Sequence, residues 1–294
     1  MFLNVEIIKS EISPKLPKNW EFIARPRDRA RGILSSLERQ LYLAFPQLID
    51  SLNLPDFLVV GNPQSGTSWL YKCLNSHRQI NLTSQKETRY FDRFFHLPLG
   101  FYSSLFQPSN HQILGEVNPS YAPLREHRIQ YIKKLLPSLK IFFIVRNPID
   151  RTWSHCRRRF SGNNIGKEEI CWVLDPQTRP KGDCHVDGWR WHTPSNFKRW
   201  SKYFGEESVH LLFFEDIYER PIILLSNIAS ILHIENEWSP NELVQPVNSN
   251  PWQDISPELW LYLFRIFEEE INQIQVLTNR DISHWKRFGA KTSN

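Results

Sequence analysis

The stretch that most restricts the possible fold is DFLVVGNPQSGTSWL, at residues 56–70. A short apolar run ends at Gly61, a loop containing Gly66 follows, and a helical pattern begins near Thr67. This order of strand, glycine-containing loop and helix is the setting of a phosphate-binding loop. The two glycines have the spacing of G-x-x-x-x-G-K-[ST], and Ser68 stands at the final hydroxyl, but Thr67 replaces the lysine. We therefore expect an anion cradle that differs from an ordinary ATP site.

Three further apolar runs predict buried strands, and each is followed by a turn or a helical pattern. They are ILGEV at 113–117, KIFFIVR at 140–146 and VHLLFFED at 209–216. Strands that alternate with helices predict an α/β fold with a parallel sheet. We expect a P-loop-containing three-layer fold, with a central parallel sheet flanked by helices. Its functional edge should lie at the carboxyl ends of the strands.

The chain divides into a short extension and one larger domain. Residues 1–55 predict an N-terminal helical extension, because apolar residues have helical spacing over 28–53. Residues 56–294 form the main domain, which ends with a long helix near 256–276. Residues 161–190 are rich in Gly, Pro and Asp and predict a long inserted loop, a candidate lid over an acceptor.

Composition narrows the class of protein. Of the 294 residues 40% are hydrophobic, which excludes wholesale disorder. The net charge of +5 suits an anionic ligand and is too small to indicate a nucleic-acid partner. No apolar run reaches the length of a membrane span, and acidic residues stand where a signal peptide excludes them, so we expect a cytoplasmic protein without a membrane partner. Pairing of Cys171 with Cys184 stays open, and the oligomeric state is not predicted.

A second segment, RNPIDRTWS at 146–154, extends the anion chemistry. Arg146 ends a predicted strand, and Ser154 lies eight residues later in the next helix. A guanidinium fork and a hydroxyl can together hold a second phosphate. A kinase is disfavoured, because the loop lysine is missing and Arg146 stands where a magnesium-binding acid would be expected. Two phosphate sites favour a nucleotide that is phosphorylated at both the 5′ and 3′ positions.

These segments resemble the PAPS-dependent sulfotransferase family, in its bacterial and heparan-type branch. The loop PQSGTSWL resembles the family's P-K-S-G-T-[ST]-W-L, and RNPIDRTWS resembles its R-x-P-x-D-R-x-x-S. Three further segments are similar to elements of that branch: QKETRYFD at 85–92, GEVNPSY at 115–121 and FKRWSKYFGEESVHLLFFEDI at 197–217. The resemblance covers roughly residues 56–235.

The resemblance implies transfer of a sulfuryl group from PAPS to a hydroxyl or amine, with release of PAP and without a metal. The motifs do not identify the acceptor; the lid-like insertion and the modest net charge favour a small molecule, and we expect a natural product of bacterial secondary metabolism. The cofactor-binding residues implied by the two motifs are Gln64, Ser65, Gly66, Thr67, Ser68, Trp69, Arg146 and Ser154.

The catalytic residues are expected near the K-E element. Glu87 is the expected base, and the alternative is a surface carboxylate paired with Lys86 or Arg89. His96 is the rival base, because HLP is similar to the catalytic segment of the cytosolic branch. Glu116 is expected to be structural or to orient the acceptor.

Two departures from the family pattern put catalysis in question. Gln64 stands where the family has a basic residue, usually lysine, that reaches the donor's sulfuryl group. We expect Lys86 to supply the missing charge; the alternatives are a P-loop kinase or a catalytically impaired protein that binds PAP or PAPS. The segment QPVNSNPWQDIS, at 245–256, lacks the basic residues that help to hold the 3′-phosphate in the family. Arginines at 157–159 could assist Arg146 there, or form a solvated helix end.

Overall fold

The structure is a computed structural model of the chain, and it describes residues 28–109, 112–160, 165–174, 191–238 and 255–289. Its centre is a parallel sheet of five strands in the order β2-β3-β1-β4-β5. The strands are β1 Phe57–Gly61, β2 Ile80–Leu82, β3 Ile113–Val117, β4 Lys140–Val145 and β5 Val209–Phe213. Helices connect them, as parallel neighbours require.

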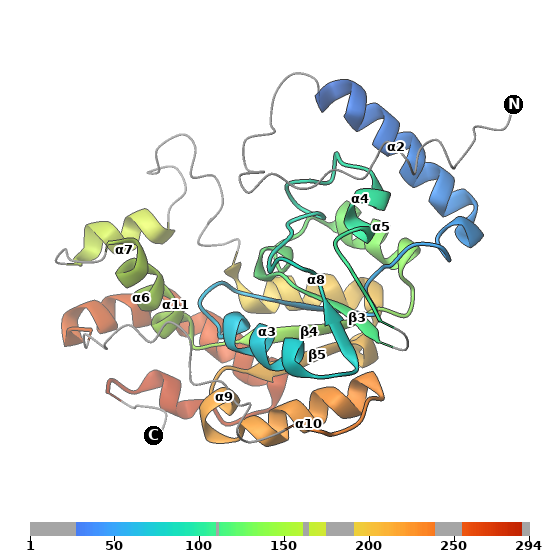
Figure 1. The fold of residues 1–294 in the computed structure, drawn as a ribbon. Coiled ribbons are helices and arrows are strands. Elements are labelled where there is room, and N and C mark those ends of the chain that lie inside the picture. The colour runs from blue at the N-terminus through green and yellow to red at the C-terminus, as the bar shows by residue number, and fades with distance from the viewer. Residues whose placement is uncertain (1–27, 110–111, 161–164, 175–190, 239–254, 290–294) are drawn as a thin grey trace, which may run out of the picture.

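Helices surround this sheet (Figure 1). In chain order they are α2 Asp28–Ala44, α3 Thr67–Ser76, α4 Leu99–Ser103, α5 Glu126–Leu135, α6 Pro148–Arg159, α7 Lys167–Leu174, α8 Thr193–Phe204, α9 Asp216–Glu219, α10 Pro221–Leu232 and α11 Pro257–Thr278. Among the described residues, no helix combines the length and apolar character needed to cross a membrane.

Two separate apolar clusters on the sheet confirm the predicted three-layer α/β fold. Side chains alternate between the faces of a strand, so Leu58 and Val60 enter one cluster while Phe57 and Val59 enter the other. The first cluster includes residues of α5, α6, α8 and α11, and the second includes residues of α3 and α10. Both faces of the sheet are therefore buried, which explains why its strands read as continuous apolar runs.

The extension and the predicted insertion differ from expectation. Residues 28–53 are not one helix: α2 ends at Ala44, and Pro46 begins a short 3-10 turn, because proline cannot donate the next helical hydrogen bond. Part of the predicted loop 161–190 is the helix α7, which buries Ile170 and Val173 against the core. Residues 161–164 and 175–190 lie outside the described residues, as do 1–27 and most of 245–256.

The strand β2, Ile80–Leu82, was not predicted from the sequence. It pairs in parallel with β3 at the edge of the sheet. Three residues are too few to show a periodic pattern, so only the pairing identifies it.

The cysteine question is settled in part. Cys171 is a free thiol whose sulfur lies 3.2 Å from the hydroxyl of Tyr262. Cys184 lies outside the described residues.

Candidate active site

The glycine-containing loop has the backbone geometry of an anion cradle. Gly61 ends β1 with φ 145°, and a Cβ there would lie 2.9 Å from the carbonyl oxygen of Ile144. Gly66 adopts a left-handed conformation, φ 83°, and a Cβ there would lie 2.3 Å from Ile217. Helix α3 begins at the next residue, Thr67. The loop therefore delivers its backbone to a helix N-terminus, where unsatisfied N–H groups favour an anion.

A cleft of about 380 Å³ lies beside this loop. It is lined by residues of both predicted motifs, which follow the carboxyl ends of β1 and β4: Gln64, Gly66, Thr67, Ser68, Trp69, Arg146, Asp150 and Ser154. The sequence thus correctly placed these two segments at one site. Trp69 also belongs to the core, since its side chain is 5% exposed. The predicted residue Ser65 is different: its side chain is fully buried, does not line the cleft, and its hydroxyl has no partner.

Arg146 is a buried cation on one wall of the cleft. Its side chain is 6% exposed, and its guanidinium lies 4.0 Å from the centre of the Phe214 ring. One guanidinium nitrogen donates to the carbonyl of Gln64, whereas Nε has no partner within the described ranges. No carboxylate of the described residues is within ion-pairing distance, and burial lowers the pKa of Arg146 while Asp150 opposes this effect. Such a group favours an anionic ligand.

Gln64 links the two motifs in an arrangement that the sequence did not predict. Its backbone is left-handed, with φ 64°. Its side-chain oxygen accepts from the hydroxyl of Ser154 at 3.4 Å. The side chain is therefore turned toward the predicted 3′-phosphate residues, and it brings no charge to the cleft.

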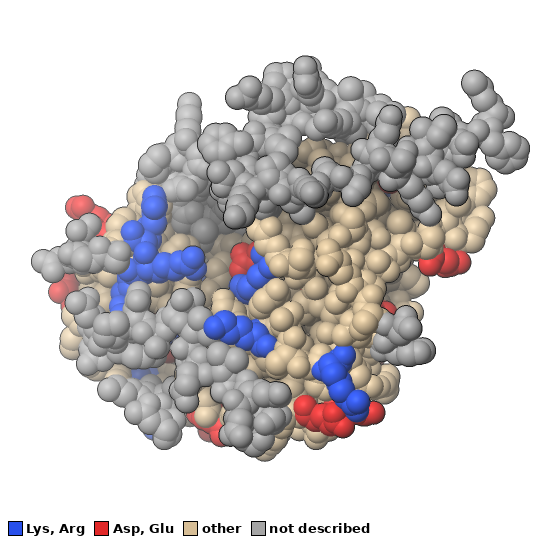
Figure 2. All heavy atoms as spheres, in the orientation of Figure 1, with Lys and Arg blue, Asp and Glu red and all other residues tan. Residues whose placement is uncertain are grey.

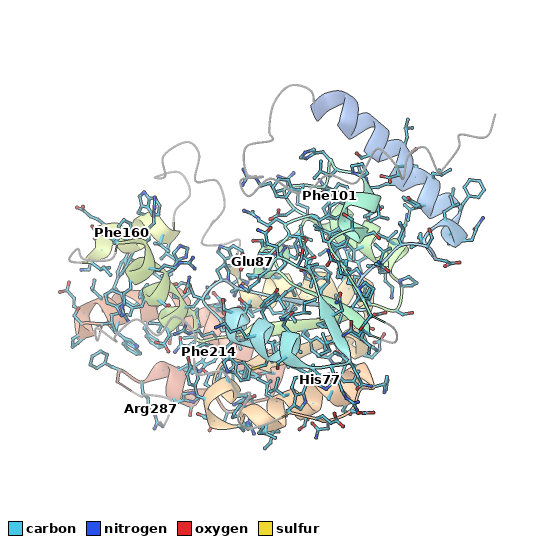
Figure 3. All side chains as sticks on the ribbon, in the orientation of Figure 1. His77, Glu87, Phe101, Phe160, Phe214 and Arg287 are labelled. Atoms are coloured by element: carbon cyan, nitrogen blue, oxygen red, sulfur yellow. The ribbon has the colours of Figure 1, made fainter. Side chains whose placement is uncertain are left out.

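The opposite wall carries an ion pair between Lys86 and Glu87. Lys86 Nζ lies 2.6 Å from Glu87 Oε1, and both residues line the cleft. The side chains are 22% and 38% exposed. Glu87 and Phe214 lie at the same end of the sheet (Figure 3). Glu87 is thus both a partner of Lys86, as the alternative interpretation proposed, and a cleft carboxylate.

A buried polar network lies next to Glu87. Glu116 is fully buried and accepts from four side chains: Thr88 at 2.6 Å, Tyr102 at 2.6 Å, Asn118 at 2.9 Å and Tyr121 at 3.1 Å. Burial raises the pKa of Glu116, and these hydrogen bonds oppose the rise. Because Thr88 follows Glu87 directly, the network fixes the backbone that carries the cleft carboxylate. The sequence motifs contain Glu116 and Tyr121 but do not show that Tyr102 joins them.

His96 lies outside the cleft. Its carbonyl accepts from the Ser35 hydroxyl of α2, and its ring contacts Phe94. The structure therefore does not bring His96 together with the loop and the residues Lys86 and Glu87.

Residues that the sequence analysis missed lie behind Arg146. Glu215, 4% exposed, accepts from Trp285 Nε1 at 2.9 Å, and burial raises its pKa to about 7. Asp216 pairs with Arg280 through two contacts of 2.8 Å. The segment FFED signals these acids, but the partners Arg280 and Trp285 lie more than sixty residues later.

Basic side chains flank the cleft. Lys and Arg residues gather around α6 and α7 on the face drawn in Figure 2. Arg157 and Arg158 of α6 line the cleft, while the Arg159 guanidinium lies 5.0 Å from the centre of the Trp172 ring. Two of the three arginines therefore lie at the cleft, and the third packs against Trp172 of α7.

Comparisons with known proteins identify the family of the chain. The sulfotransferase domain family matches residues 54–250. The membrane-associated sulfotransferase kil1 of Dictyostelium discoideum is 30% identical over 78% of this chain and 66% of its own length. The bifunctional heparan sulfate N-deacetylase/N-sulfotransferase 4 of Mus musculus is 26% identical over 65% of this chain. This chain covers 66% of the length of kil1 and 23% of the length of the Mus musculus protein, which is less than two thirds in both cases.

Solved structures share the fold. A sulfotransferase from Alicyclobacillus acidocaldarius superposes with a TM-score of 0.65 at 21% identity, over 80% of this chain and 99% of that one. Mouse sulfotransferase SULT7A1, in complex with PAP, superposes with a TM-score of 0.51 at 15% identity, over 87% of this chain and 96% of that one. With the family match over two thirds of its length, the chain belongs to the sulfotransferase family.

Proposed function

We propose that the protein transfers a sulfuryl group from PAPS to a hydroxyl or amine of an acceptor and releases PAP. The observation that carries this proposal is Arg146, a buried cation without an ion pair among the described residues, in the same cleft as the glycine loop. A nucleotide with a 3′-phosphate would supply the missing negative charge. Ser154 and Arg157 or Arg158 would add donors to that phosphate.

The loop would hold the 5′-phosphosulfate. Backbone N–H groups at the start of α3 point toward an anion in this position, and the hydroxyls of Thr67 and Ser68 line the same cleft. Trp69 would contribute mainly through packing, because it is almost fully buried. Ser65 would contribute through its backbone, since its side chain does not line the cleft.

Glu87 and Lys86 would carry the chemical step. The acceptor oxygen or nitrogen attacks sulfur, the bond between sulfur and the bridging phosphate oxygen breaks, and PAP leaves with that electron pair. Glu87 would take the proton of the acceptor. Lys86 would donate to the sulfuryl or bridging oxygens, where negative charge develops, and would replace the lysine that Gln64 lacks.

The acceptor that we propose is a small molecule. The cleft of about 380 Å³ is in the usual range of small-ligand pockets, and in this proposal the nucleotide donor takes up much of it. A natural product and a bacterial setting follow from the sequence analysis alone and stay predictions. The cytoplasmic location also stays a prediction, and subcellular fractionation would test it, since the relative kil1 is named as membrane-associated.

Thermal unfolding with PAP, 5′-AMP or ATP plus Mg²⁺ tests the nucleotide site. A ligand at 100 times its Kd should stabilise the fold by ~2.7 kcal/mol. We expect a clear rise in Tm with PAP, a smaller one with 5′-AMP, and PAP formation when labelled PAPS is incubated with an acceptor panel. A response to ATP plus Mg²⁺ alone would favour the kinase alternative.

Because Gln64 is uncharged, one other function is a candidate: binding of PAP without catalysis. Strong stabilisation by PAP, together with no transfer or hydrolysis of PAPS across the panel, would favour this alternative. Turnover of PAPS would exclude it.

A further inference from the structure

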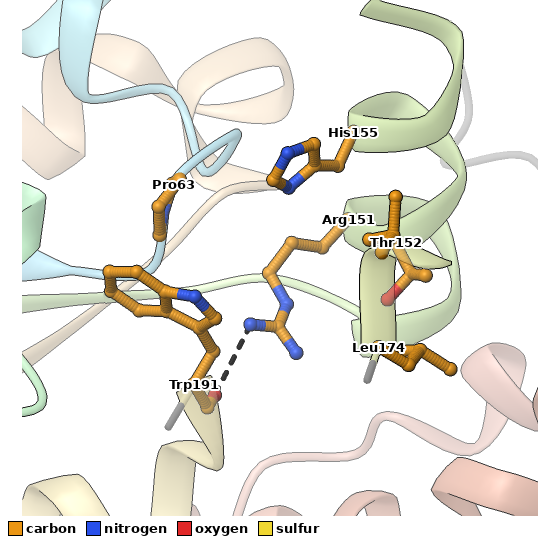
Figure 4. Close-up of a pocket in the computed structure, with 7 residues that line it drawn as sticks. Pro63, Arg151, Thr152, His155, Leu174 and Trp191 are labelled. Atoms are coloured by element: carbon orange, nitrogen blue, oxygen red, sulfur yellow. Dashed lines mark hydrogen bonds between the residues drawn. The ribbon is translucent and has the colours of Figure 1, made fainter. Parts of the chain in front are cut away.

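A second, smaller pocket adjoins the phosphate loop. Its volume is about 20 Å³, and it lies between α6, α7 and the residue Trp191 that precedes α8. Pro63 lines both this pocket and the cleft. Figure 4 shows the Arg151 guanidinium and the Trp191 indole on neighbouring sides of the pocket, with His155 above them. None of these residues has a role in the proposed transfer reaction.

Arg151 is a second buried cation that has no counter-ion among the described residues. Its side chain is 6% exposed, and no described residue accepts a hydrogen bond from its Nε. Within the described residues no carboxylate lies in ion-pairing range of Arg151. Glu270 interacts with Arg151 electrostatically from a longer distance, and its Oε1 accepts a hydrogen bond from Thr193 N. Burial lowers the pKa of Arg151, and Arg146 adds to this effect. A buried charge in this state is costly unless an anion compensates it.

Trp191 adds a second unsatisfied donor to the same pocket. The residue is 5% exposed, and its Nε1–H has no acceptor in the part of the chain that the structure describes. A water molecule that accepted from Arg151 and Trp191 would still need acceptors for its own two hydrogens. The nearby Trp191 carbonyl already accepts from Asn62 Nδ2 at 2.9 Å and from Arg151 at 3.2 Å. An anion accepts from both donors and has no hydrogens to place.

We propose that this pocket binds one small inorganic anion of the size and charge of chloride, held by Arg151 Nε and Trp191 Nε1. The pocket has room for about one or two water-sized particles, which excludes a nucleotide phosphate with its sugar. The same two residues join α6 to the phosphate loop through Asn62. Anion binding therefore stabilises the backbone that leads into the cleft, and it does so without PAP.

Crystals of the full chain grown or soaked in sodium bromide test the site directly. We expect an anomalous bromide peak within hydrogen-bond distance of Arg151 Nε and Trp191 Nε1. The variant Trp191→Phe replaces the indole by a smaller phenyl ring that has no N–H donor, so the peak should fall or vanish. A matched control is Trp260→Phe on α11, whose ring stacks on Phe264 away from this pocket; it should keep the peak.

A solution measurement covers the case in which crystals are not obtained. Sodium chloride is exchanged against sodium gluconate at constant ionic strength, without nucleotide, and Tm is recorded. We expect a saturable rise of about 2–3 °C for the wild type and for Trp260→Phe. The rise should be absent in Trp191→Phe and in Arg151→Met.

Three results would overturn the proposal. One is ordered water without anomalous signal at the site, and another is a halide response that is equal in Trp191→Phe and the wild type. The third is a response that does not saturate, which would indicate a general salt effect. If Arg151→Met does not fold, the comparison of Trp191→Phe with Trp260→Phe still decides.

Discussion

The side-chain oxygen of Gln64 lies 3.4 Å from the hydroxyl of Ser154, so the residue that replaces the family lysine contacts the second phosphate motif. In the same loop, the Gln64 carbonyl accepts from Arg146. Gln64 therefore connects the two segments that are predicted to bind anions, and it brings no charge to the cleft. The positive charge nearest to the expected base is Lys86, at 2.6 Å from Glu87.

The base assignment predicts opposite results at Glu87 and His96. Glu87→Gln keeps a side chain of the same size but cannot accept a proton, so we expect kcat to fall by about 10²–10⁴ with little change in PAP affinity. His96→Gln should keep kcat within a few-fold, because His96 does not line the cleft. Steady-state kinetics with labelled PAPS measures both, and the reverse order would assign the base to His96.

The charge assignment predicts a rescue between two positions. Lys86→Ala should lower kcat by about 10²–10³, the usual effect of removing one transition-state donor. Gln64→Lys restores the family residue and should recover part of this loss in the double variant. A Lys86→Ala enzyme with unchanged turnover would refute the role of Lys86. If Gln64→Lys lowers activity in both backgrounds, the bridge to Ser154 matters more than the charge.

Arg146 should distinguish nucleotides that differ only in the 3′-phosphate. Arg146→Met removes charge-assisted hydrogen bonds that are worth about 1.5–3 kcal/mol, so PAP should bind about 10–150-fold more weakly. The affinity for 5′-AMP should change much less, because that ligand lacks the 3′-phosphate. Calorimetric titration of both ligands checks the difference. An equal loss for PAP and 5′-AMP would place Arg146 at the 5′ side.

The network around Glu116 should contribute to stability. Tyr102→Phe removes a 2.6 Å hydrogen bond to a fully buried carboxylate and should lower the free energy of unfolding by about 1–3 kcal/mol. The matched control is Tyr203→Phe, which removes a bond to Glu126 at the surface and should change stability by less than about 0.5 kcal/mol. Urea unfolding compares them, and equal losses would contradict the importance of burial here.

Glu215 predicts a pH-dependent part of the stability. Burial raises its pKa to about 7 from an ordinary value of 4.5, so the folded protein retains a proton that the unfolded chain has released. The stabilisation is full below about pH 4.5 and is lost as the pH rises through 7, by roughly 3 kcal/mol at most.

Glu215→Gln removes this titration and should flatten the profile between pH 4.5 and 7.5. Urea unfolding across this range is compared with Glu269→Gln, an exposed control on α11. The plot of unfolding free energy against pH should have a smaller slope for Glu215→Gln than for Glu269→Gln. Identical slopes for the two variants would show that another group titrates.

The sequence alone was enough to predict the three-layer fold and the two anion-binding segments. Buried parallel strands appear in the sequence as short apolar runs, which indicate the fold. A Cβ at Gly61 or Gly66 would clash with neighbouring atoms, so the two glycines mark the loop in the sequence. The sequence also correctly predicted that Arg146 and Ser154 line one cleft. These residues follow strand ends, and parallel strands bring their carboxyl ends to one edge.

Tertiary structure alone decided which polar groups meet. Glu87, the expected base, and His96, its rival, are nine residues apart in the sequence, but of the two Glu87 lines the cleft and His96 does not. Arg151 and Trp191 are forty residues apart, and the tertiary structure brings them to one pocket, where Arg151 Nε and Trp191 Nε1 have no hydrogen-bond partner among the described residues. Local sequence determines backbone conformation and apolar periodicity. Burial, and with it the cost of an uncompensated charge, depends on contacts between distant segments.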